Sequence, residues 1–245
     1  MRRLAGGSHL ALWAPALAAP AVFLLSFQWT PRWLFPLLLA APLYPVFAAS
    51  VRRGAEARAV TAVLLWAVGL CLCATTVSMH RPVEAERAIW NSRPYAEKTI
   101  DWLRTGEGEE GSPARFLPRH ALELVVFSAL ALATGGAGAL VLGAALLNHM
   151  SFYVAAVWRL SSGSPLALLF AWPPWALVRI AAYVALGTAL AAPLLRPHPP
   201  GSPRSRISRA LLAVGLGGVL LDIVLKSLLA PAWRLLLLRL VGQLP

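Results

Sequence analysis

Long apolar stretches, each near the roughly 20 residues that a helix needs to cross a lipid bilayer, dominate the chain. Only 13% of the 245 residues are charged, about half the fraction found in soluble domains, so a soluble fold would expose large apolar patches. The sequence therefore predicts an all-α, polytopic transmembrane helix bundle. We expect six spans, over residues 10–27, 33–50, 59–78, 120–147, 166–195 and 210–229.

The arginines between the spans predict an orientation, because short cytoplasmic loops are enriched in Arg and Lys. Arg2 and Arg3 precede the first span, and Arg52, Arg53 and Arg58 separate the second from the third. This places the N-terminus and the 52–58 loop in the cytoplasm. The Arg-rich composition, with only two lysines among 22 basic residues, suggests a bacterial cytoplasmic membrane.

The loop 196–209 conflicts with a count of six. It carries four arginines and no acid, which predicts a cytoplasmic location, yet six spans place it outside. The apolar run over 120–160 is long enough for two tight helices that bend at Gly135-Gly136, so a seven-span alternative stays open.

One polar segment, 81–119, holds seven of the ten acidic residues and seven basic ones, so its net charge is zero. Pro94 suits the first turn of a helix, and the pattern that follows predicts a short amphipathic helix with Tyr95, Thr99, Trp102 and Leu103 on one face. That face would pack on the membrane helices or on a protein partner. The Gly-Glu run 106–111 is expected to be a flexible loop, because it lacks the spacing and the lysine of a phosphate-binding loop.

These features divide the chain into four parts. Residues 1–80 hold the first three transmembrane helices, 81–119 the polar segment, and 120–230 the remaining spans. The Leu-rich tail 231–245, with two arginines, is expected to form a helix in the membrane interface.

Asp222 and Lys226 lie one turn apart in the last expected span. At this spacing the side chains can meet, and each alone would be costly inside the bilayer. One interpretation is an ion, proton or substrate site. The preferred interpretation is a structural pair that neutralises itself, with Lys226 extending towards the interface.

Arg179 follows the helix break that Pro173-Pro174 predicts. A new helix N-terminus attracts anions, so Arg179 could complete an anion site at membrane depth. The alternatives are contact with lipid phosphates, or an intramembrane pair with Asp222.

His120 and Glu123 are three residues apart at the start of the fourth expected span. Such pairs hold metals in di-iron bundles, which need further carboxylates that this chain lacks at matching depth. Glu123 is also favoured in a first turn by the helix dipole. We therefore predict no metal and no cofactor.

Small residues at four-residue spacing let membrane helices approach closely. Such ladders predict tight helix contacts within the chain or between copies of a homo-oligomer, and they comprise Gly135, Ala139, Gly143, Ala213 and Gly217.

Function is the least determined property. HExxH is absent, and no Ser-His or aspartate pair can be placed at matched depth, so an enzyme is the less favoured class. The net charge of +12 is explained by orientation and by anionic lipids rather than by nucleic acid.

The preferred hypothesis is a non-enzymatic subunit or scaffold of a membrane complex, with 81–119 as the surface for a partner. The alternative is a small-solute permease, or the membrane subunit of a transporter, with Arg179, Asp222 and Lys226 as its polar site.

Overall fold

The computed structural model describes residues 10–196 and 206–242, with the side chains of 10–12 and 206–208 also outside the description. The described chain consists of helices and short connections, without a strand. Five of these helices are long and apolar enough to cross a membrane, namely α4 (Glu56–His80), α7 (Pro113–Thr134), α8 (Ala137–Leu160), α10 (Pro174–Leu195) and most of α11 (Arg206–Leu240). The predicted helical bundle is confirmed, and the chain is a multi-pass membrane protein.

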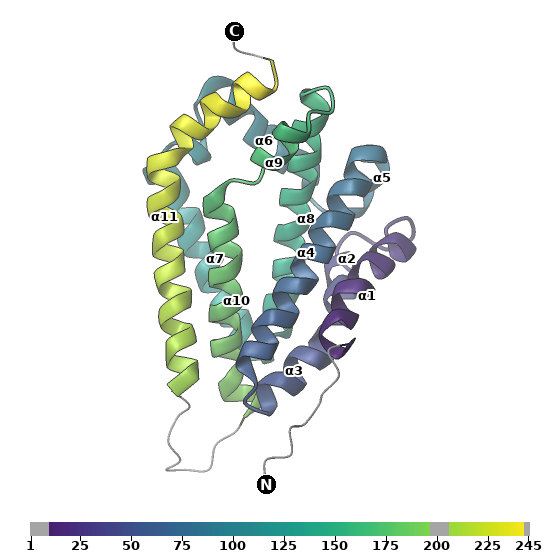
Figure 1. Cartoon of the computed structure of the whole chain (residues 1–245), viewed down its shortest axis with the longest axis vertical. Coiled ribbons are helices and arrows are strands. Elements are labelled where there is room, and N and C mark those ends of the chain that lie inside the picture. Colours follow the sequence, from purple (N-terminus) through teal and green to yellow (C-terminus); the bar gives the residue numbers. More distant parts are fainter. Residues whose placement is uncertain (1–9, 197–205, 243–245) are drawn as a thin grey trace.

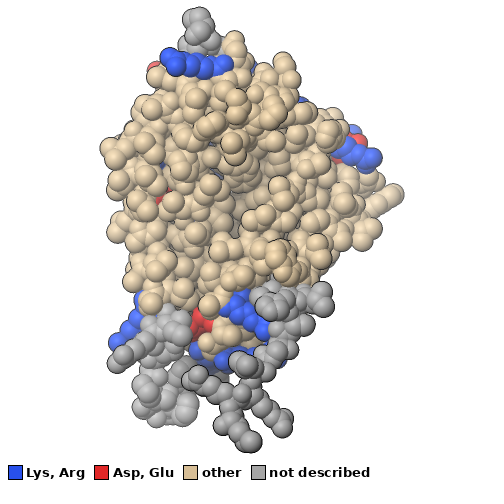
Figure 2. All heavy atoms as spheres, in the orientation of Figure 1, with Lys and Arg blue, Asp and Glu red and all other residues tan. Residues whose placement is uncertain are grey.

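The space-filling view supports this assignment. On the face shown in Figure 2, charged side chains gather at the two ends, and a broad belt with few charged atoms separates them. A belt of this kind is what a lipid environment requires of the outer surface.

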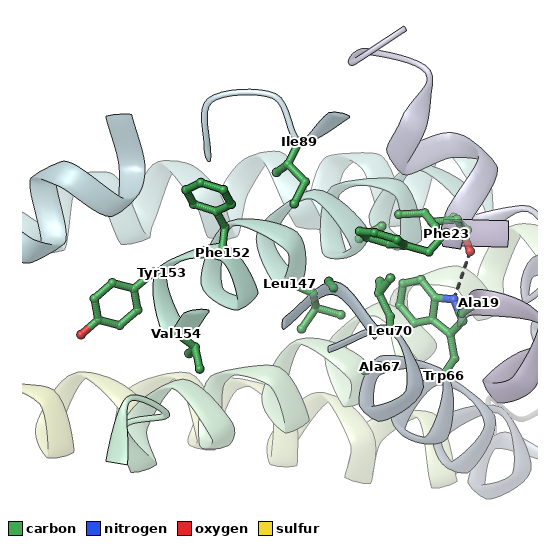
Figure 3. Close-up of a cluster of buried hydrophobic side chains, with 14 of the residues drawn as sticks. Ala19, Phe23, Trp66, Ala67, Leu70, Ile89, Leu147, Phe152, Tyr153 and Val154 are labelled. Carbon is green, nitrogen blue, oxygen red and sulfur yellow. Dashed lines mark hydrogen bonds between the residues drawn. The ribbon is translucent and has the colours of Figure 1, made fainter. Parts of the chain in front are cut away.

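The first two expected spans are shorter and more broken than a simple crossing. Helix α1 (Leu10–Ser26) contains two prolines, and the 33–50 stretch divides near Pro42 into α2 (Phe35–Ala40) and α3 (Tyr44–Arg52). At this break the Leu43 amide bonds to the Ala40 carbonyl, and the indole of Trp66 on α4 donates to the Leu39 carbonyl at 3.0 Å (Figure 3). A neighbouring helix thus satisfies backbone that the break leaves free.

The polar segment forms three short elements, α5 (Pro82–Ala88), α6 (Ser92–Thr105) and the 3-10 turn η1 (Glu109–Gly111). The predicted amphipathic helix is α6, which packs on α8. Trp102 and Leu103 are buried. The apolar face of α6, expected to pack on the membrane helices or on a partner, therefore packs largely on the protein's own helices. The polar segment also ends earlier than expected, because residues 113–119 already belong to α7.

The single helix expected over 120–147 is wrong. Gly135 and Gly136, at φ 58° and 90°, end α7 and start α8. Glycine enters this left-handed region without the steric cost that a side chain brings. The bend proposed in the seven-span alternative is therefore observed.

This bend removes the topological conflict. Three long helices, α7, α8 and α10, now follow the polar segment, so the end of α10 at Arg196 and the start of α11 lie at the opposite end of the bundle (Figure 1). Arg196 bonds to Glu56 at the start of α4. The Arg-rich 52–58 loop and the end of α10 at Arg196 accordingly lie at the same end.

The break at Pro173-Pro174 is also observed, between α9 (Pro165–Phe170) and α10. Helix α11 continues through Pro231 to Leu240 without the separate tail helix expected over 231–245, and its last turns bend over the end of the bundle (Figure 1). Residues 243–245 lie outside the described part. Arg234 donates to the carbonyls of Trp102, Leu103 and Arg104, and so caps the end of α6.

Four helices form a ring in which each packs on the next, in the order α4, α8, α7 and α10. Helix α11 packs outside α10 at one edge of the molecule, and α1–α3 pack at the other (Figure 1). The main apolar core lies between α1–α3, α4 and α8, where Phe23, Leu70 and Leu147 are buried (Figure 3).

Candidate functional site

The ring of α4, α7, α8 and α10 surrounds a cavity of about 190 Å³. A space of this size holds several waters or one small solute. Its deeper walls are apolar, with Phe47, Leu140 and Phe127 among them. Its other end, beneath α6 and η1, is charged, and the side chains there are Lys98, Glu109, Glu110, Arg119, His120, Glu123 and Arg179.

Arg179 and Asp222 form the most deeply placed ion pair of this end. Arg179 Nε donates to Asp222 Oδ2 at 2.9 Å, and Nη2 donates to Oδ1 at 3.0 Å. Asp222 is only 1% exposed. Two parallel bonds fix the plane of the guanidinium as well as its position. Asp222 of α11, which does not line the cavity, thereby fixes the Arg179 guanidinium of α10 at the cavity wall.

His120 of α7 lies against the same carboxylate. Its Nε2 is 3.9 Å from Asp222 Oδ2, and its ring is 5.2 Å from that of Phe116. His120 is 8% exposed; its ring interacts with the Phe116 backbone one turn earlier, and no side chain of the described residues completes a hydrogen bond to either ring nitrogen. Buried polar groups normally have a full set of partners, and this imidazole has no side-chain partner at hydrogen-bond distance.

Lys226 of α11 bonds to η1 rather than to its neighbour in sequence. Its Nζ is 2.8 Å from Glu110 Oε2 and 4.5 Å from the centre of the Phe116 ring. The ammonium is 1% exposed, so the carboxylate and the aromatic face replace its water. The expected self-neutralising pair of Asp222 and Lys226 is therefore wrong. Each of the two has its own partner from another element.

The outer rim is a chain of surface ion pairs. Glu109 of η1 bonds to Lys98 of α6 and, at 2.9 Å, to Arg119 of α7, and Arg119 in turn donates to Glu123 at 3.0 Å. Burial alone would raise the pKa of the Glu109 carboxyl, but the bonds from Lys98 and Arg119 outweigh it and hold this pKa below its ordinary value. Glu109 is thus charged at neutral pH and fixes η1 at the polar end of the cavity.

The structure brings together all five residues singled out as the candidate polar site, Arg179, Asp222, Lys226, His120 and Glu123. Sequence reasoning missed Glu109 and Glu110, which lie in the run expected to be a flexible loop. Their only signal was the excess of carboxylates in that run. No group of three His, Cys, Asp or Glu side chains suited to a metal occurs within residues 10–196 and 206–242.

The small residues have mixed roles. Gly135 forms the α7–α8 turn, Ala139 is buried, and Gly143 lines the cavity with open space where a Cβ would lie. Ala213 and Gly217 are exposed on α11. The close contact of α11 with α10 is made instead by Gly215 against Leu186 and Gly218 against Ala182.

Comparison with known protein families, with curated proteins and with solved structures finds no match for this chain.

Proposed function

We propose that this membrane protein binds a small solute in the cavity of its four-helix ring and moves it across the bilayer, either as a permease or as the membrane subunit of a transporter. The observation that carries the proposal is the cavity itself, which joins an apolar chamber at membrane depth to a charged rim. A concave, mostly apolar site with a few convergent polar groups is typical of small-molecule binding.

The cost of the charged groups supports the same function. Charges inside a membrane helix bundle are expensive, and an apolar replacement of a buried ion pair is often at least as stable. Arg179 and Asp222 nevertheless occupy the wall of the cavity and the helix behind it. Their position is accounted for if the guanidinium contacts a ligand.

The proposed orientation places the Arg-rich end, with Arg53, Arg58 and Arg196, in the cytoplasm of a bacterial cell. The charged rim of the cavity then faces the outside, and uptake from that side is the proposed direction.

A test can use Gly143, which lines the cavity with open space around it. Gly143→Leu should fill part of the cavity, since an added Cβ meets no atom within 4 Å. Gly217→Leu is the matched control, because Gly217 also has open space but lies on the exposed side of α11.

Proteoliposomes containing either variant or the unmodified chain would be incubated with the small-molecule extract of the host cell, and the retained solutes identified by mass spectrometry. The proposal expects at least one solute that the unmodified chain and Gly217→Leu retain and Gly143→Leu does not. Identical solute profiles for all three proteins would contradict it.

A second proposed function is a subunit of a membrane complex, favoured by the exposed small-residue face of Ala213 and Gly217 on α11. Mass spectrometry of native lipid particles should then show a partner chain, or a second copy, that Gly217→Leu removes. Recovery of the chain alone in both cases would contradict this alternative.

A further inference from the structure

The imidazole of His120 and the guanidinium of Arg179 lie side by side at the cavity. Both lie near the same oxygen, Asp222 Oδ2. Arg179 Nε donates to it at 2.9 Å, and His120 Nε2 is 3.9 Å from it. Asp222 does not line the cavity, whereas His120 and Arg179 do. The two nitrogen-rich groups therefore form the wall, and the carboxylate stands behind them.

This wall can hold a carboxylate. A guanidinium has five N–H donors, of which Nε and one N–H of Nη2 bond to Asp222, so further donors remain. His120 adds a ring nitrogen without a side-chain hydrogen bond among the described residues. A planar carboxylate matches the forked geometry of the arginine donors.

A cationic group of the ligand would have its own partner one turn away. Glu123 is three residues after His120, so the two side chains share one face of α7, and both line the cavity. Arg119 Nε bonds to Glu123 Oε1, which leaves the other oxygen of that carboxylate to accept from an ammonium.

The charges of the site balance without a ligand. Lys98, Arg119, Arg179 and Lys226 oppose Glu109, Glu110, Glu123 and Asp222. A net charge added to a site at membrane depth would be costly. A ligand that carries one positive and one negative group keeps this balance.

The deeper chamber would take the rest of the ligand. Phe127 and Tyr183, with ring centroids 4.6 Å apart, line the cavity together with Leu140. These walls offer dispersion contacts to an apolar group and few hydrogen bonds. A volume of about 190 Å³ suits a short chain or a single ring.

We propose that the ligand is a small zwitterion with an apolar side chain, of the α-amino acid type, whose carboxylate binds Arg179 and His120 and whose ammonium binds Glu123. This inference rests on the proposed solute site and names the class of its ligand.

Four six-carbon compounds separate the contributions of the head groups, namely norleucine, hexanoate, hexylamine and hexan-1-ol. A ligand that binds the folded state raises the unfolding temperature with its concentration. For the purified full-length protein, norleucine should give a saturable rise that exceeds the rise from each of the other three. An equal or larger rise with hexanoate or hexylamine would overturn the zwitterion proposal, as would no rise with norleucine.

Two variants assign the contacts. His120→Leu should abolish the norleucine effect, and Glu123→Gln should reduce it to the size of the hexanoate effect, whereas Arg93→Ala, an exposed change on α6, should leave it intact. Folding is expected to survive Glu123→Gln even if His120→Leu fails to fold, because the amide can still accept from Arg119. An unchanged norleucine effect in Glu123→Gln would overturn the assignment.

The extract experiment with Gly143→Leu keeps the two proposals separate. A retained solute of another class would leave the solute site standing and refute only the zwitterion.

Discussion

Arg179 and Asp222 show how single side chains become tolerable at membrane depth. The guanidinium and the carboxylate satisfy each other through two hydrogen bonds, and Lys226 is neutralised by Glu110 and by the Phe116 ring. Each charge is therefore held by a partner from another element. Replacing one partner of an ion pair should therefore lower the free energy of unfolding far more than replacing both partners.

Asp222→Ala leaves Arg179 buried without its counter-charge, and we expect it to lower the free energy of unfolding by roughly 3–5 kcal/mol. The double change Arg179→Leu with Asp222→Leu should restore most of this stability. Chemical denaturation in detergent measures both effects. A double variant as unstable as the single one would show that the ion pair is not the origin of the loss.

The lowered pKa of Glu109 predicts that the stability of the protein depends on pH. Because its pKa is lowered in the folded protein, its contribution is fully present above the unfolded value of about 4.3. The contribution is lost as the pH falls through the lower, folded pKa. It should be at most about 1 kcal/mol, since Glu109 and its partners are partly exposed.

The measurement compares thermal unfolding of the unmodified chain and Glu109→Gln from pH 7 down to pH 3. The two curves should differ at pH 7 and converge in acid. A difference that grows as the pH falls would contradict the assignment.

At the scale of elements, one glycine pair and one proline pair mark where helices stop, whereas single prolines lie inside α1 and α11 without ending them. The Gly135-Gly136 bend and the Pro173-Pro174 break could both be predicted, because each residue type acts on its own backbone. The packing face of α11 could not. A membrane helix is apolar towards lipid and towards its neighbours alike, so periodicity does not distinguish Gly217 from Gly218.

These two glycines predict opposite effects of one added methyl group. In Gly218→Ala the new Cβ would lie 2.7 Å from that of Ala182, and forcing the helices apart should cost about 1–3 kcal/mol. Gly217→Ala meets open space and should stabilise α11 by roughly 0.5–1 kcal/mol through helix propensity. Unfolding temperatures of the two variants provide the comparison, and equal shifts would be inconsistent with the α10–α11 contact.

At the scale of the whole molecule, the ring of four helices brings together residues that no local pattern connects. Lys226 meets Glu110, and Arg179 meets Asp222, only because α11 packs outside α10 and passes η1. The sequence indicated which polar residues were unusual, since charges are rare in spans. It offered the pair of Arg179 and Asp222 only as one alternative and missed that of Lys226 and Glu110, because spacing along one helix reports only neighbours on that helix.

The order of the helices predicts on which side of the membrane each connection lies. In a chain with Cys71 and Cys73 replaced by alanine, cysteines at Asp101 and Arg209 should react with an impermeant maleimide from opposite sides of the membrane. Three long helices, α7, α8 and α10, separate these two positions. A cysteine at Arg53 should react from the same side as one at Arg209, and labelling of Asp101 and Arg209 from a single side would refute the observed helix order.

The solute site requires that water reach the cavity, and labelling of a cysteine in the cavity wall measures this directly. Cysteines at Gly143, which lines the cavity, and Gly217, which faces away from the bundle, would be exposed in turn to a small charged methanethiosulfonate. The reagent requires an ionised, hydrated thiol. We predict modification of position 143 from the side that bears α6, and no modification of position 217. A cysteine at 143 that stays unreactive from both sides, while one at Asp101 reacts, would contradict the solute site.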